Sequence, residues 1–229
     1  MKKLTYLLFL CSLITFGQGL VEEEDEDALG SWFMYFGKHR VADKWSIHTE
    51  AQYRTYEFGN NFNQLLLRTG INYDISEKVM VTLGYGNITT DGTFIDVDDE
   101  KNSNENRIYQ QLVIRNNFGK LNLSHRYRLE QRFIDNNVTG NVTQHRARYF
   151  LKATYPIGEK WYLAAYDEIF INLQEPLFGQ NRLYGAIGHK LNDNIKIEVG
   201  YLRNHFTEKE FKRLQFGIWW TTDWRKDKS

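Results

Sequence analysis

The feature that most constrains this chain is the alternation of apolar and polar side chains over long segments. In residues 125–133, HRYRLEQRF, the apolar side chains Tyr127, Leu129 and Phe133 take odd positions and the charged ones take even positions. Successive side chains of a strand point to opposite faces, so one face is apolar and the other is charged. The predicted strands, each bounded by turn residues, are 44–58, 63–75, 79–90, 107–117, 121–133, 144–156, 161–172, 180–191, 195–206 and 211–224.

The lengths of these segments and of their connections favour a membrane barrel. The segments run to about 11–13 residues, whereas a tilted membrane-crossing strand needs about 9–11 and a globular strand about 5–6. Short turns are expected at 74–78, 117–120, 156–160 and 191–194. Longer polar loops are expected at 86–106, 134–143, 172–181 and 205–210. Short turns at one end and long loops at the other are typical of an outer-membrane barrel.

Alternation alone does not choose between this barrel and a soluble β-sandwich with its apolar face inward. The positions of the tryptophans favour the barrel: Trp45 and Trp161 open strands after short turns, and Trp220 and Trp224 lie near the last turn-side end. Trp prefers the membrane–water interface, so these four residues are predicted to form an aromatic girdle. A soluble core rich in aromatic side chains is the alternative.

The beginning of the chain predicts export. Lys2 and Lys3 precede an apolar stretch that is too short to span a membrane, so residues 1–17 are interpreted as a signal peptide. Residues 18–28, which include EEEDED, are predicted to be an acidic, flexible mature N-terminus, and residues 29–229 a single barrel domain. The only cysteine, Cys11, lies in the signal peptide, so no disulfide is expected.

Together with this signal, the stretches GSWFMYFGK (30–38), KWSIHTEAQYR (44–54) and HRYRLEQRF resemble a family of outer-membrane β-barrels of the Bacteroidetes type that is known only as a domain of unknown function. The resemblance covers nearly the whole mature chain. It implies an outer-membrane location in a Gram-negative cell and brings no established activity.

The polar faces of the predicted strands form the candidate site. A lumen charge network is predicted from Glu50, Arg54, Arg126, Arg128, Glu130, Arg132, Arg146, Arg148 and Glu168. Charges inside a narrow barrel must pair to offset desolvation, so the network is interpreted first as a structural filling. A cationic lumen that favours anionic solutes, or that binds a partner segment, is the functional alternative.

Segment 29–37 does not fit an even strand count, because the ten strands above already form an even set and single-chain bacterial barrels usually have even counts. Trp32 and Phe36 oppose Phe33 and Tyr35, so both faces are apolar. We consider a strand buried on both sides, a strand with an undetected partner, and an interfacial anchor. The expected fold is therefore an all-β, closed antiparallel transmembrane up-and-down barrel of about 10–12 strands.

No catalytic signature emerges. Ser124 and His125 are sequence neighbours and point to opposite faces, so they cannot act together as nucleophile and base. No catalytic residue, metal site or cofactor is predicted, and a net charge of +0 gives no argument for nucleic acid. The expected function is non-enzymatic: a structural or complex subunit, or a narrow pore with a largely plugged lumen. Its expected partners are outer-membrane lipid, lipopolysaccharide and a membrane-complex protein. A lipid hydrolase or acyltransferase and a soluble periplasmic barrel binding an apolar ligand are the alternatives.

Overall fold

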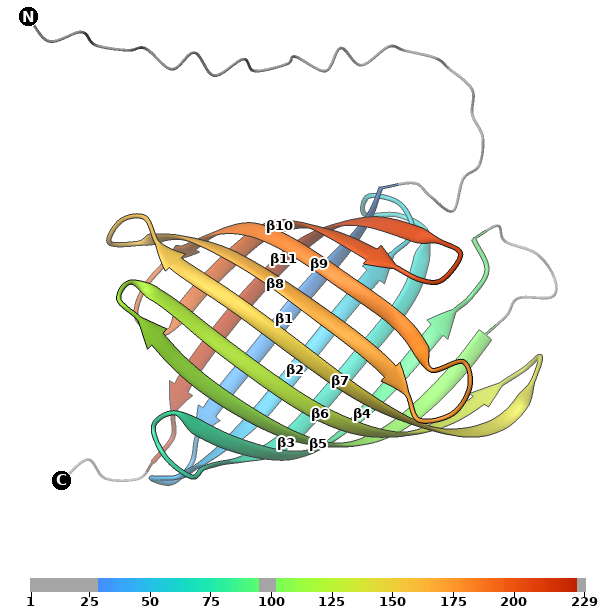
Figure 1. Ribbon diagram of the computed structural model, residues 1–229, viewed down its shortest axis with the longest axis horizontal. Helices are drawn as coiled ribbons and strands as arrows, with labels where there is room; N and C mark the ends of the chain where they lie inside the picture. Colours follow the sequence, from blue (N-terminus) through green and yellow to red (C-terminus); the bar gives the residue numbers. More distant parts are fainter. Residues whose placement is uncertain (1–28, 95–101, 226–229) are drawn as a thin grey trace, which may run out of the picture.

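A computed structural model describes residues 29–94 and 102–225, which form one closed barrel of eleven strands (Figure 1). Each strand pairs with its sequence neighbours in antiparallel register. The strands are β1 Gly30–Arg40, β2 Trp45–Thr55, β3 Phe62–Asp74, β4 Val79–Asp91, β5 Asn102–Phe118, β6 Leu121–Asn136, β7 Gly140–Pro156, β8 Trp161–Asn172, β9 Phe178–Lys190, β10 Ile195–His205 and β11 Glu210–Asp223. No helix of the described residues is long and apolar enough to cross a membrane.

The barrel closes between its first and last strands, and this pair is parallel. Trp32 of β1 lies opposite Gln215 of β11, and Phe36 lies opposite Trp219. The expected closed, all-β barrel of about 10–12 strands is therefore confirmed, and it is antiparallel except at this seam. Residues 30–37 of the segment 29–37 belong to β1, whose second partner is β11. It is not buried on both sides, because Phe33 is 40 % exposed on the outer face. An odd number of strands makes the parallel pair unavoidable, because β1 and β11 then run in the same direction.

The connections at the two ends of the barrel differ less in length than the sequence predicted. The turn end carries connections 41–44, 75–78, 119–120, 157–160 and 191–194, and the loop end carries 56–61, 92–101, 137–139, 173–177 and 206–209. Much of the predicted loops at 86–106 and 134–143 is strand, because the polar residues there continue the pairing of β5, β6 and β7. The β6–β7 hairpin consequently projects past the β8–β9 connection at the loop end (Figure 1).

The two faces of the barrel have opposite chemistry. Tyr127 and Leu129 are 47 % and 50 % exposed on the outside, while Arg128 and Glu130, between and beside them in sequence, are buried inside. The same apolar outer surface continues around the barrel with Leu65, Leu67, Ile71, Leu83, Ile108, Leu163, Leu183, Ile187, Val199 and Ile218. This arrangement is the reverse of a soluble sandwich, whose apolar face would be inside.

Candidate functional site

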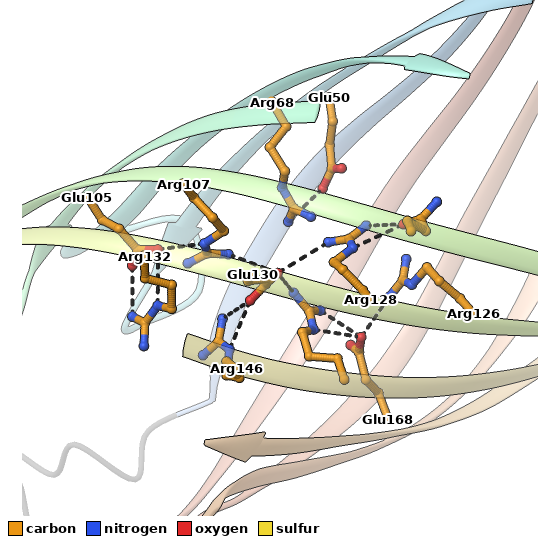
Figure 2. Close-up of polar contacts among 12 residues, drawn as sticks. Glu50, Arg68, Glu105, Arg107, Arg126, Arg128, Glu130, Arg132, Arg146 and Glu168 are labelled. Atoms are coloured by element: carbon orange, nitrogen blue, oxygen red, sulfur yellow. Dashed lines mark hydrogen bonds and ion pairs between the residues drawn. The ribbon is translucent and has the colours of Figure 1, made fainter. Parts of the chain in front are cut away.

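The nine residues of the predicted charge network all lie on the inner faces of their strands. Glu50 and Arg54 come from β2, the even-numbered residues 126–132 from β6, Arg146 and Arg148 from β7, and Glu168 from β8. Figure 2 labels seven of these side chains and shows that they come from neighbouring strands: Glu50, Arg126, Arg128, Glu130, Arg132, Arg146 and Glu168. Glu168 faces inward and its neighbour Asp167 outward, where the Asn181 amide donates to it at 3.1 Å. We call these nine residues, with the interior partners described next, the charge network.

Glu130 is the centre of the charge network. Its side chain is completely buried, and its two oxygens accept hydrogen bonds from Arg146 at 2.6 Å and Arg148 at 2.7 Å. Arg107 and Arg128 approach the same carboxylate at 3.5 and 3.6 Å. Hydrogen bonds with a charged donor and acceptor are the strong ones, so one carboxylate holds side chains from β5, β6 and β7 together.

Glu168 extends the charge network to the next strand. Arg126 and Arg148 each donate to Glu168 Oε1 at 2.7 Å, and Arg182 of β9 lies 3.9 Å from Oε2. Because Arg148 donates to both Glu130 and Glu168, it links the two carboxylates. The ion pairs therefore follow the inner wall of the barrel from β5 to β9.

Two further glutamates belong to the charge network, and sequence analysis missed one of them. Glu50 pairs with Arg68 of β3 at 3.2 Å, and Gln52 also donates to it. Glu105 pairs with Arg107 at 2.5 Å and with Arg132 at 2.7 Å. Glu105 fell in a predicted loop, and Arg107 at the first position of a predicted strand, so neither was assigned to the lumen. Continuing the alternation of β5 backward from Tyr109 would have found both.

Positive charge exceeds negative charge in this interior. Eight arginines pair with the four glutamates: Arg68, Arg107, Arg126, Arg128, Arg132, Arg146, Arg148 and Arg182. Arg54 adds a ninth, and its partners among the described residues are the neutral amides of Gln52 and Gln64. Within the charge network, nine arginines against four glutamates leave five positive charges; the buried Glu198, outside the network, pairs with Lys152 at 2.6 Å.

The wall opposite β6 is aromatic rather than charged. Trp32, Tyr184 and Leu202 form a buried cluster, with Met34, Tyr166 and Ala186 packed against it. Aromatic faces attract cations: the Arg54 guanidinium lies 3.8 Å from the Trp32 ring centroid and that of Arg182 lies 4.8 Å from it. The arginines thus pack between carboxylates on one side and aromatic rings on the other.

Three spaces follow one another along the interior and share part of their lining. A central cavity of about 210 Å³ lies between the charge network and the aromatic wall. A loop-side vestibule of about 350 Å³ is bounded by Arg54, Arg132, Arg146, Arg182 and Arg213. A turn-side vestibule of about 520 Å³ contains Lys152, Lys190 and Lys196.

The four tryptophans predicted as a girdle lie at the turn end, and each is exposed. Trp45 and Trp161 begin β2 and β8, Trp220 lies opposite Ile195 at the start of β10, and Trp224 follows β11. Trp219 points the other way, into the barrel, where Lys152 Nζ lies 4.9 Å from its ring centroid.

Arg225 lies two residues after the end of β11. Its hydrogen bonds to Asp223 and Asp43 raise its pKa, and the bond to Asp43 joins this residue to the β1–β2 turn.

Two histidines of the outer face, His39 and His125, bind neighbouring side chains. His125 Nδ1 lies 2.9 Å from the Tyr149 hydroxyl, and its neighbour Ser124 is on the other face. His39 is buried beneath Trp224, with the hydroxyls of Thr222 and Thr49 at 2.7 and 2.9 Å from its two ring nitrogens. In the described part of the chain, no three His, Cys, Asp or Glu side chains are grouped to hold a metal ion.

The fold and the interior define a closed up-and-down β-barrel with an arginine-rich lumen. The model of one family, described as a protein of unknown function (DUF2490), matches residues 29–215. The chain belongs to this family, and the match covers all of β1 to β10. No curated protein and no solved structure matches the chain.

Proposed function

We propose that this protein is an outer-membrane β-barrel with a structural, non-enzymatic role and a lumen closed to diffusing solutes. The observation that carries the proposal is the inversion of its faces: large apolar side chains such as Leu83, at 61 % exposed, cover the outside, while the arginines and glutamates lie inside. Exposed apolar surface of this extent costs free energy in water. Hydrocarbon is the environment that removes this cost.

Closure of the strands supports the same location. A strand edge inside a bilayer would leave backbone groups with no hydrogen-bond partner, so membrane-crossing sheets must be closed. Here β1 and β11 remove the last edge. The outer surface would then contact lipid, and the exposed tryptophans at the turn end would lie at the periplasmic interface. Lipopolysaccharide and a membrane-complex protein are the partners that such a location offers.

The closed lumen is inferred from the charge network. Its ion pairs link β5 to β9 along the inner wall, and the aromatic cluster around Trp32 lies on the opposite side. A pore that conducts ions needs a continuous water-filled path. The space left between the two walls is about 210 Å³, and this small volume favours a barrel that stays closed.

Fractionation of cells that produce the full chain tests the location. The protein is expected in the outer-membrane fraction and is expected to migrate faster on a gel when the sample has not been heated, as folded barrels do. Recovery of the mature protein in the soluble periplasmic fraction would overturn the proposal.

Planar bilayers test the closed lumen separately. Purified protein is expected to give no stepwise currents. A variant in which Arg148 and Glu168 are both replaced by alanine removes the middle of the charge network and is expected to conduct. Regular current steps from the wild-type protein would contradict the closed state while leaving the membrane location unaffected.

A further inference from the structure

The loop-side vestibule has a charge that the described residues do not balance. Of the residues that bound it, eight are arginines and one, Glu105, is acidic; the arginines are Arg54, Arg68, Arg107, Arg132, Arg146, Arg148, Arg182 and Arg213. Glu50, Glu130 and Glu168 lie deeper in the barrel and compensate part of this charge through their ion pairs with these arginines. A buried cation without a counter-charge costs several kcal/mol, so the excess calls for an anion.

Several arginines that bound the loop-side vestibule remain partly accessible from it. Arg132, Arg146 and Arg182 keep 18 %, 12 % and 11 % of their side-chain surface accessible. Among the described residues, the hydrogen bonds of Arg54 go to amide oxygens. Deeper in the wall, Arg68 Nε and Trp32 Nε1 are buried donors with no hydrogen-bond partner among the described residues. A guanidinium offers its donors as a planar fork that matches carboxylates and phosphates.

We propose that the loop-side vestibule is a binding site for a multivalent oxyanion, carrying several carboxylate or phosphate groups. The fixed positions of the arginines favour multivalency, because their side chains come from β2, β6, β7 and β9 and surround one space of about 350 Å³. A ligand with several oxyanion groups can reach arginines on more than one of these strands at the same time. This inference goes beyond the structural role proposed above and holds whether or not the barrel lies in a membrane.

The oxyanion has two candidate sources. One is a free solute. The other is the chain itself: residues 22–27 read EEEDED, lie outside the described residues, and precede β1 by two positions. β1 begins at the rim of this vestibule, since an added Cβ at Gly30 would lie 2.7 Å from Arg213 Cδ. The chain is neutral overall, with 29 basic and 29 acidic residues, so the charge that the interior lacks is present elsewhere in the sequence.

The site is tested by titrating citrate into the purified mature protein in detergent and measuring binding by isothermal titration calorimetry. Acetate at matched ionic strength is the comparison. Citrate is expected to bind at least about tenfold more tightly than acetate, and its affinity is expected to fall with added salt. The Arg54→Gln and Arg182→Gln variants are each expected to lose about tenfold in citrate affinity, the usual effect of removing a charge-assisted hydrogen bond.

Arg203→Gln is the matched control, because Arg203 lies on the neighbouring strand β10 with its side chain on the outer surface. Its citrate affinity is expected to equal that of the wild type. If Arg182→Gln folds poorly, Arg182→Lys keeps the charge without the fork and is expected to bind citrate more weakly than the wild type. Gel migration of unheated samples verifies that each variant is folded.

A chain in which residues 22–27 carry Gln and Asn in place of Glu and Asp distinguishes the two sources. If these residues occupy the vestibule, the neutralised chain is expected to bind citrate about tenfold more tightly than the wild type. Equal affinities would assign the site to a free solute. The proposal is overturned if citrate binds no better than acetate to both the wild-type and the neutralised chain. Neither result bears on membrane location, which fractionation tests by itself.

Discussion

Two opposite sides of the barrel interior differ in composition, although on both of them every second side chain of a strand points inward. On β6 the inward positions are Arg126, Arg128, Glu130 and Arg132; on β1 they include Trp32, Met34 and Phe36. The outer faces of the two strands are alike, with Tyr127 on one and Phe33 on the other both exposed. The difference therefore belongs to the interior and is not a consequence of what surrounds the barrel.

This contrast shows how a charged interior can be packed without a carboxylate for every arginine. Carboxylates satisfy the arginines next to β6, β7 and β8, while aromatic rings contact those that face the other wall. Arg148 makes both kinds of contact on the charged side itself, because it pairs with Glu130 and Glu168 and its guanidinium lies 4.2 Å from the ring centroid of Phe170 on β8. If this division is correct, each side should be sensitive to a different kind of substitution.

The largest effect is expected on the charged side, from Glu130→Gln. This change leaves Arg107, Arg128, Arg146 and Arg148 around a neutral amide. Removing one partner of a buried charge pair costs about 3–5 kcal/mol, so the free energy of unfolding should fall by about that amount. Urea unfolding followed by tryptophan fluorescence measures it.

Glu210→Gln is the control for that measurement, since Glu210 pairs with Arg203 at the exposed loop end. Exposed pairs contribute little to stability, and this variant should unfold at the same urea concentration as the wild type. Equal midpoints for Glu130→Gln and the control would mean that the charge network is not what stabilises the interior.

Trp32→Ala is the corresponding change on the aromatic side. It removes a buried ring from the cluster with Tyr184 and Leu202 and from contact with Arg54 and Arg182. Replacing a buried Trp by Ala costs about 3–5 kcal/mol. Urea unfolding of Trp161→Ala, whose ring is exposed on the outer face, should show a smaller loss. Should both variants unfold alike, the aromatic wall would be no better packed than the surface.

A smaller effect is expected where glycines make room for interior tyrosines. A Cβ at Gly84 would lie 2.2 Å from Tyr109 Cζ on the charged side, and one at Gly200 would lie 2.5 Å from Tyr184 Cζ on the aromatic side. Overpacking costs about 1–3 kcal/mol, so both alanine variants should lose a similar amount in urea unfolding. Gly185→Ala is the control, because nothing lies within 4 Å of its added Cβ. If only one of the two variants, Gly84→Ala or Gly200→Ala, lost stability, only the wall that contains that glycine would be rigid.

The sequence was sufficient to predict which side chains of each strand point inward or outward. It was not sufficient to predict which side chains of different strands contact one another. A period of two assigns Arg128 inward and Leu129 outward without any knowledge of neighbouring strands. It cannot show that Arg148 lies between Glu130 and Glu168, because that depends on the register of three strands. It also could not place β1, since apolar residues on both faces of Trp32–Phe36 remove the alternation. The parallel seam requires knowing that the last strand returns to the first.

The smallest effect tests that seam against an ordinary antiparallel pair. Phe33 and Phe216 stack across β1 and β11 with ring centroids 5.3 Å apart, and Tyr127 and Tyr149 face each other across β6 and β7 at 5.0 Å. Double-mutant cycles with alanine should give a coupling of about 0.5–1.5 kcal/mol for each pair, measured by urea unfolding. Because coupling requires the rings to remain in contact, a value near zero for Phe33–Phe216 alone would mean that β1 and β11 separate readily. The barrel would then open most readily at the seam between β1 and β11.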